Sequence, residues 1–309
     1  MDDTNRAVLI MAAIFVFSQL GALALVASAL GEENQAFEDP NDPMIPVYYV
    51  IAIVLFTFLV LYIIKKKRDD VVRIIFIGAV SFTIFYVILT VATLFDEGLL
   101  ALMVSIMLTA ILVYLLAKKP EWYVVDATGI LVAIGVIGIL GVSLNILPVL
   151  ILLIILAVYD AISVYGTKHM IDLADGVTKM HLPILLVIPK RRGFSYLRQK
   201  SLKAQLDDGE EREAMYMGLG DIIIPGVLVA SAFYFLPSDI VGGIGAGNLL
   251  IALGTIVGAT IGFLVLMRYV IKGNPLAGLP LLNGGAVAGY VISYLIVFQE
   301  FSLGIVTPW

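Results

Sequence analysis

The chain has 309 residues, of which 61% are hydrophobic and 14% are charged. Soluble domains carry about 45–50% apolar and about 25% charged residues, so this composition excludes an ordinary soluble domain and predicts a polytopic membrane protein. The net charge of −5 argues against nucleic acid as a partner, and the absence of cysteine excludes disulfides, thiolate metal sites and cysteine nucleophiles. The two histidines, His169 and His181, lie in a polar region, so we expect neither a metal nor a cofactor.

Nine apolar stretches follow one another along the chain, each near the roughly 20 residues that a membrane-spanning helix needs. The first stretch is too long, and too acidic at its flank, for a cleaved signal peptide, so we expect it to be retained. No internal repeat is evident, which disfavours the inverted-repeat design of many transporters. We therefore predict an all-α polytopic membrane protein with nine transmembrane helices, at residues 7–30, 45–64, 72–94, 98–117, 122–143, 147–166, 215–236, 245–271 and 277–298.

The basic residues predict the orientation of these spans. All 19 lysines and arginines fall on the N-terminal tail, or in or near every second connection, so they share one side of the membrane. The positive-inside rule assigns that side to the cytoplasm. We expect a cytoplasmic N-terminus, a cytoplasmic connection at 167–214 and a C-terminus outside.

Two connections stand out by their composition. The outer loop from Gly31 to Pro46 holds five acidic residues; a calcium site is one interpretation, but a solvated acidic loop is favoured. The inner connection, 167–214, contains an apolar island at 182–189 that is bracketed by prolines and too short to span. This island could lie at the membrane interface, plug the bundle, or cover apolar surface.

Two carboxylates, Asp160 and Asp221, lie well inside predicted spans, and we take them to be the only acidic residues that do so. An acid in hydrocarbon costs about 2.5–3.5 kcal/mol even on lenient scales, which indicates a function. Each lies about six residues from the cytoplasmic end of its span, roughly 9 Å deep at the rise of an α-helix. Equal depth on consecutive antiparallel helices favours a facing pair, which would share one proton and activate water. The alternatives are a purely structural pair and a proton- or cation-coupled transporter that uses both aspartates as a relay.

Glycines and a tyrosine lie next to these acids in the sequence. Gly218 and Gly220 flank Leu219 directly before Asp221, and glycine lets a second backbone approach closely. Tyr159 precedes Asp160 and either contacts substrate or packs in the bundle.

The pairs Tyr159-Asp160 and Gly218-Leu219-Gly220-Asp221 resemble the YD and GxGD motifs of the presenilin and signal peptide peptidase family of intramembrane aspartyl proteases. The resemblance extends over nine spans, and the inside N-terminus is typical of the presenilin branch. It implies an aspartic endopeptidase that cleaves within transmembrane helices, with Asp160 and Asp221 as catalysts. The family's Pro-Ala-Leu motif is only partly present, because Ala277-Gly278-Leu279-Pro280 stands in its place. Gly278, Leu279 and Pro280 are therefore expected to shape the site beside the aspartates.

The resemblance also implies partners and organisation. We expect single-span membrane proteins as substrates, no obligate partner subunits, and the cell membrane of a prokaryote, in particular an archaeon; homo-oligomerisation is left open. In presenilins the enzyme cuts its own inner loop, which the 182–189 island loosely resembles. The predicted division is a six-span bundle at 1–166, the cytoplasmic loop at 167–214, and a three-span part at 215–309.

Overall fold

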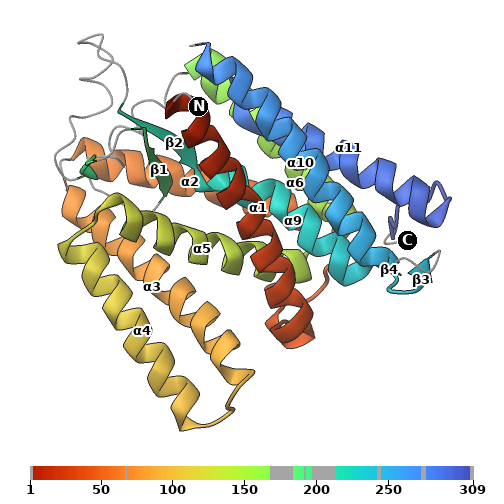
Figure 1. Cartoon of the computed structure of the whole chain (residues 1–309), viewed down its shortest axis with the longest axis horizontal. Coiled ribbons are helices and arrows are strands. Elements are labelled where there is room, and N and C mark those ends of the chain that lie inside the picture. Colours follow the sequence, from red (N-terminus) through yellow and green to blue (C-terminus); the bar gives the residue numbers. More distant parts are fainter. Residues whose placement is uncertain are drawn as a thin grey trace. The chain divides into compact units, whose positions relative to one another are not determined.

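The computed structural model describes residues 3–66, 68–167, 184–190, 193–196, 213–241, 245–272 and 276–306 (Figure 1). Eight helices in this part of the chain are long and apolar enough to cross a membrane, and a ninth is shorter. The α-helices are α1 Asp3–Ala29, α2 Ile45–Lys65, α3 Asp69–Thr93, α4 Leu99–Lys118, α5 Trp122–Ser143, α6 Ile146–Ile162, α9 Leu219–Phe235, α10 Gly247–Ile271 and α11 Gly278–Phe298. The predicted all-α membrane architecture is confirmed. Each helix begins and ends within a few residues of the ends of a predicted span.

The start of the seventh span differs from the prediction. Residues 214–218 form a strand, β2 Ala214–Gly218, which pairs antiparallel with β1 Leu185–Pro189. The helix α9 therefore begins only at Leu219 and has 17 residues. Residues 215–217 are apolar and carry no charge, so composition alone does not mark the start of the span as extended. The strand forms because β1 supplies its hydrogen-bond partners. Of the three interpretations of the 182–189 island, none anticipated a strand, and residues 182–183 lie outside the described residues.

The chain divides into two compact units, each assembled from separated stretches of sequence. The first unit comprises residues 1–11, 53–135 and 167–219, and the second comprises 12–52, 136–166 and 220–309.

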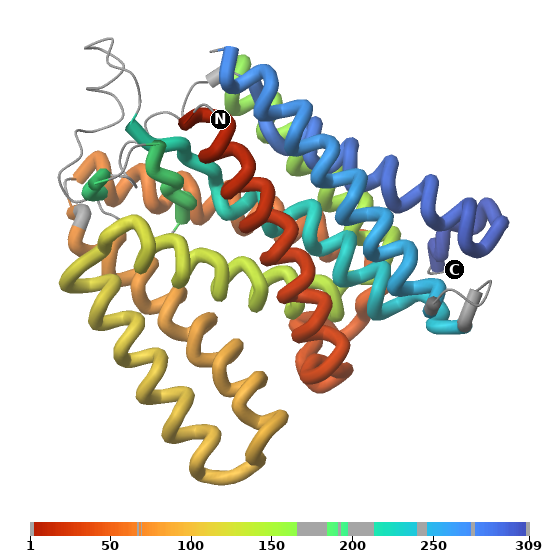
Figure 2. The backbone as a smooth tube through the Cα atoms, in the orientation of Figure 1, coloured from red at the N-terminus to blue at the C-terminus, as the bar shows by residue number. Residues whose placement is uncertain are grey.

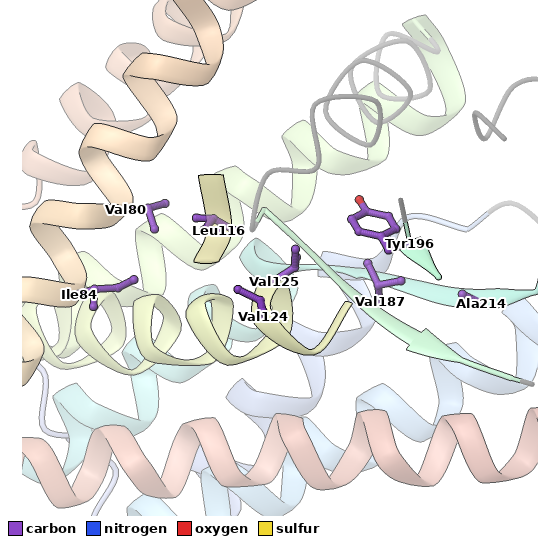
Figure 3. Close-up of a cluster of buried hydrophobic side chains, with 8 residues drawn as sticks. All are labelled: Val80, Ile84, Leu116, Val124, Val125, Val187, Tyr196 and Ala214. Atoms are coloured by element: carbon purple, nitrogen blue, oxygen red, sulfur yellow. The ribbon is translucent and has the colours of Figure 1, made fainter. Parts of the chain in front are cut away.

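The core of the first unit gathers around α3, α4, the start of α5 and the two strands. Figure 3 shows its eight buried side chains, with α5 contributing Val124 and Val125 and β1 contributing Val187. The complete cluster is Val80, Ile84, Leu116, Val124, Val125, Val187, Tyr196 and Ala214. The Arg73 guanidinium of α3 donates to the carbonyl oxygen of Ala117 at the end of α4, 2.8 Å away, and so satisfies one of the carbonyls that a helix end leaves without a partner.

In the second unit α10 packs along α11, which also contacts α6 (Figure 2). The approach of α10 to α11 depends on small residues, as is common between membrane helices. A methyl group on Gly258 would overlap the carbonyl oxygen of Gly285 and lie 2.7 Å from Cα of Gly289. Because backbone atoms rather than flexible side chains fill this space, the two helices depend on glycine here.

The acidic loop of the second unit is held by neutral groups. Ser143 Oγ accepts a hydrogen bond from the amide of Ala36 at 2.8 Å, and Asn145 Nδ2 donates to Asn41 Oδ1 at 2.7 Å. The backbone amide of Asn145 also donates to the carbonyl oxygen of Pro40 at 2.9 Å. The turn between α5 and α6 therefore fixes the loop through a hydroxyl and amides. Among the residues described, no three His, Cys, Asp or Glu side chains gather as a metal ion would require.

Candidate active site

Asp160 lies near the end of α6, where its carboxylate meets the beginning of α11. The side chain is only 6% exposed, and its Oδ2 accepts a hydrogen bond from the backbone amide of Leu279 at 3.0 Å. The first amides of a helix have no partner within the helix, and the helix dipole favours a negative charge beside them. The start of α11 therefore supplies both a donor and a favourable field for the Asp160 carboxylate.

Asp221 lies in the first turn of α9 and is partly exposed. A Cβ built on Gly278 would lie 3.5 and 3.6 Å from the two carboxylate oxygens of Asp221. Gly278 thus backs onto Asp221 while its neighbour Leu279 bonds to Asp160. The two carboxylates converge on one dipeptide at the N-terminus of α11. Because residues 214–218 are extended, Asp221 lies in the first helical turn, and only Leu219 and Gly220 of the expected six helical residues precede it.

The 277–280 segment enters α11 from an extended backbone. Ala277 is buried and adopts φ −65° and ψ 124°, and the helix begins at Gly278. A proline disfavours helical geometry at the residue before it, but Leu279, directly before Pro280, is helical. Pro280 falls in the first turn, where an amide has no helical partner to lose, so the proline is tolerated there.

Three further polar residues make hydrogen bonds that join the elements carrying the acids to α11 or α1, and the sequence did not predict them. Tyr165 lies in a π-helical turn at Ser163–Thr167 that follows α6. Its hydroxyl accepts a hydrogen bond from the amide of Ala277 at 3.4 Å. The Asn283 amide donates to the carbonyl oxygen of Leu153 at 2.9 Å, which joins α11 to α6. Gln19 of α1 is fully buried and donates to the carbonyl oxygen of Ile222, 3.4 Å away. A lone amide inside an apolar span was a usable signal for Asn283 and Gln19; nothing in the sequence marks a π-turn.

The remaining predicted site residues differ in their exposure and in what they contact. Gly220 is exposed, and among the residues described no atom beyond its own turn lies within 4 Å of a Cβ built there. Gly218 is the last residue of β2, and Leu219 is buried against Gly129 of α5. Tyr159 and Pro280 are partly buried. The open space at Gly220 fits the expected approach of a second backbone, whereas Leu219 serves the core.

A third buried carboxylate corrects the sequence analysis, which placed only two acids well inside the spans. Asp126 lies in α5, is 5% exposed, and accepts a hydrogen bond from the backbone amide of Val187 in β1 at 2.8 Å. Asp126 lies near the start of the predicted span at 122–143. Pairing with a strand that the sequence did not predict is what draws it into the core.

Known proteins resemble this chain in sequence and in fold. A family model described as signal-peptide peptidase, presenilin aspartyl protease matches residues 12–299. Two solved structures of a presenilin family intramembrane aspartate protease, in C222 and P2 space groups, are similar to the chain. The first has 30% identity and a TM-score of 0.68, and the alignment covers 94% of this chain and 99% of that one. The second has 31% identity and a TM-score of 0.65, with 94% and 98% covered. A comparison with curated proteins gave no match.

Proposed function

Because the chain belongs to the signal-peptide peptidase and presenilin family and is therefore an intramembrane aspartyl protease, we propose that Asp160 and Asp221 form its catalytic pair. The observation that carries this proposal is the convergence of both carboxylates on Gly278 and Leu279. Neither the family nor the solved structures support a proton- or cation-coupled transporter.

The proposed chemistry divides one proton between the two acids, because neighbouring carboxylates do not both ionise cheaply. The ionised member removes a proton from water, and the water oxygen bonds to the scissile carbonyl carbon. The protonated member donates to the carbonyl oxygen. As the C–N bond breaks, the leaving nitrogen takes a proton, the two acids exchange roles, and no covalent intermediate forms. The Leu279 amide keeps one oxygen of Asp160 fixed, so the other oxygen is oriented for proton transfer.

The substrates are membrane proteins, cleaved within the bilayer. We propose that they are single-span helices that unwind locally, since an intact helix shields its carbonyl groups. The strand β2 leads directly into α9, and the space at Gly220 is open. An extended substrate segment can therefore add to the backbone near Gly220 or Leu279, as peptides add to exposed strand edges.

The enzyme is a multi-pass integral membrane protein. We propose the prokaryotic cell membrane as its location, with the N-terminus and the 167–214 connection in the cytoplasm, because every basic residue falls on that side. We also propose that it acts without partner subunits. Single cysteines placed in this Cys-free chain and labelled from either side test the orientation, which is wrong if residues 190–210 label from outside.

The catalytic pair is tested by incubating purified protein with a helical membrane substrate. Asp160→Ala and Asp221→Ala should each abolish cleavage while the protein remains folded in detergent. Asp239→Ala, at an exposed acidic residue after α9, is the matched control and should cleave normally. Cleavage that survives in either active-site variant would overturn the assignment.

A further inference from the structure

Asp126 is a buried acid that the proposed chemistry leaves unused. Its carboxylate bonds to the Val187 amide at 2.8 Å, and Val187 is completely buried. A buried amide without an acceptor costs free energy. The Asp126 carboxylate supplies β1 with the acceptor that a third strand would otherwise provide. The contact lies wholly within the first unit.

The register of the two strands shows which edge of β1 Asp126 occupies. Leu219 donates to the carbonyl oxygen of Ile184, and Lys190 donates to that of Glu213, each at 2.9 Å. In an antiparallel pair, hydrogen-bonded and non-bonded residue pairs alternate. Val187 stands opposite Tyr216 and falls between the bonded positions, so its amide points away from β2. Asp126 therefore closes the outer edge of β1.

Two further contacts make the start of α5 a support for the same strands. A Cβ on Gly129, almost one turn after Asp126, would lie 3.4 Å from Leu186 of β1 and 3.4 Å from Leu219. Glu121, directly before α5, accepts hydrogen bonds from Ser195 Oγ at 2.9 Å and from the Tyr196 amide at 3.1 Å. The beginning of α5 thus holds β1 and the residues beyond it by two carboxylates and one close apolar contact.

The supported strands are joined to the catalytic sequence through the main chain. Leu219 is bonded to Ile184 and is the first residue of α9, which carries Asp221 in its first turn. A shift of β1 is passed to β2 through their ladder, and from β2 to Gly220 and Asp221 by covalent connection. Small misplacements of a reacting group reduce turnover strongly even when the cause is remote.

We propose that Asp126 is a positioning residue for proteolysis, acting as the hydrogen-bond acceptor that fixes the β1–β2 pair and so places Asp221. The proposal rests on Asp221 being one of the two catalytic acids. An acceptor is all that the role requires, so an amide oxygen in the same place should serve. A proton-carrying role would require the acid itself.

The test compares three variants of purified enzyme on a transmembrane substrate. Asp126→Leu keeps the size but removes the acceptor, and kcat should fall roughly ten- to a hundredfold with a smaller change in KM. Asp126→Asn should keep kcat within about twofold and the parent's pH profile, because its amide oxygen accepts the same bond. Thr128→Val is the matched control: Thr128 is buried in the same helix and bonds to the Val124 and Val125 carbonyls of its own turn, so kcat should be unchanged.

A second variant, in β1, removes the donor of the same hydrogen bond. Val187→Pro removes the donor on the edge that the ladder does not use, where proline is tolerated. It should lower kcat as Asp126→Leu does, and the double variant should be no slower than either single one. This variant also decides the question if Asp126→Leu does not fold.

Several results would overturn the proposal. Full activity in folded Asp126→Leu would show that the contact does not position the site. Asp126→Asn as slow as Asp126→Leu would show that the acid itself is needed, and independent losses that multiply in the double variant would show two separate effects. Failure of the catalytic-pair assignment is recognised separately, by residual cleavage in Asp160→Ala or Asp221→Ala.

Discussion

Asp160 and Asp126 have closely similar surroundings by the usual measures. They are 6% and 5% exposed, and each accepts a backbone amide, from Leu279 at 3.0 Å and from Val187 at 2.8 Å. The difference lies in what else is present. Beside Asp160 the amide donor belongs to the start of a helix, and a Cβ built on the residue before that donor, Gly278, would lie 3.5 Å from a second carboxylate, Asp221. Beside Asp126 the donor belongs to a strand edge. Burial and a backbone hydrogen bond therefore indicate that a hydrogen-bond acceptor is needed; a second acid at the same place indicates acid–base chemistry.

The largest expected effect comes from removing the second acid, which makes the surroundings of Asp160 similar to those of Asp126. Asp221→Asn removes the second acid and leaves Asp160 as a single buried carboxylate with its Leu279 bond. Cleavage should fall by at least about a thousandfold, because the acid–base exchange is lost. The unfolding midpoint should change little, since Asp221 is partly exposed. Initial cleavage rates and a thermal unfolding curve measure both quantities, and a rate within tenfold of the parent would contradict the comparison.

The next effect tests the backbone donor at the catalytic acid. Leu279→Pro deletes the amide that bonds to Asp160, in a first helical turn that accepts proline. A hydrogen bond to a charged group contributes about 1.5–3 kcal/mol, so kcat/KM should fall roughly ten- to a hundredfold. Leu279→Ala keeps the amide and is the matched control for the lost side chain. Equal losses in both variants would assign the effect to the side chain instead.

A smaller effect tests whether the catalytic surroundings depend on helix packing. Gly258→Ala places a methyl against the backbone of α11, which carries Leu279, and should lower the free energy of unfolding by about 1–3 kcal/mol. Gly284→Ala, on α11 itself, meets no atom within 4 Å among the residues described and serves as the control. Chemical unfolding in detergent gives both values. An unaffected Gly258→Ala would mean that α10 and α11 can separate without cost.

The smallest effect concerns the departure from the family's Pro-Ala-Leu motif. Ala277 already has the φ of proline, and a methyl on Gly278 would lie 3.4 Å from Leu266 and 3.5 Å from Asp221, which are ordinary contacts. The double substitution Ala277→Pro and Gly278→Ala should leave cleavage within about twofold. Gly278→Ala should stabilise the fold by about 0.4–1 kcal/mol, because it restricts the unfolded chain. Ala277→Pro should stabilise it less, because it also removes the amide that donates to the Tyr165 hydroxyl at 3.4 Å. A tenfold loss of cleavage would show that the 277–280 backbone needs the freedom that alanine and glycine give it.

The sequence predicted the spans and the two principal acids for physical reasons. Apolar length is a local property, and a carboxylate such as Asp160 inside a long apolar run is conspicuous in any window. The strands at Leu185–Pro189 and Ala214–Gly218 depend on each other across an intervening connection, so neither is visible by itself. Asp126 was missed for the same reason, because its partner is a backbone amide of one of those strands.

The bond from Leu279 to Asp160 is made by the main chain, and this affects how the protein's relatives can diverge. Every residue except proline offers the same amide at that position, so the contact places no demand on the side chain. Ala277 and Gly278 can replace Pro and Ala while the donor stays in place. Searches that require the literal Pro-Ala-Leu letters will therefore pass over enzymes that keep the geometry. In this chain, the contact needs only the start of a helix that points at an acid.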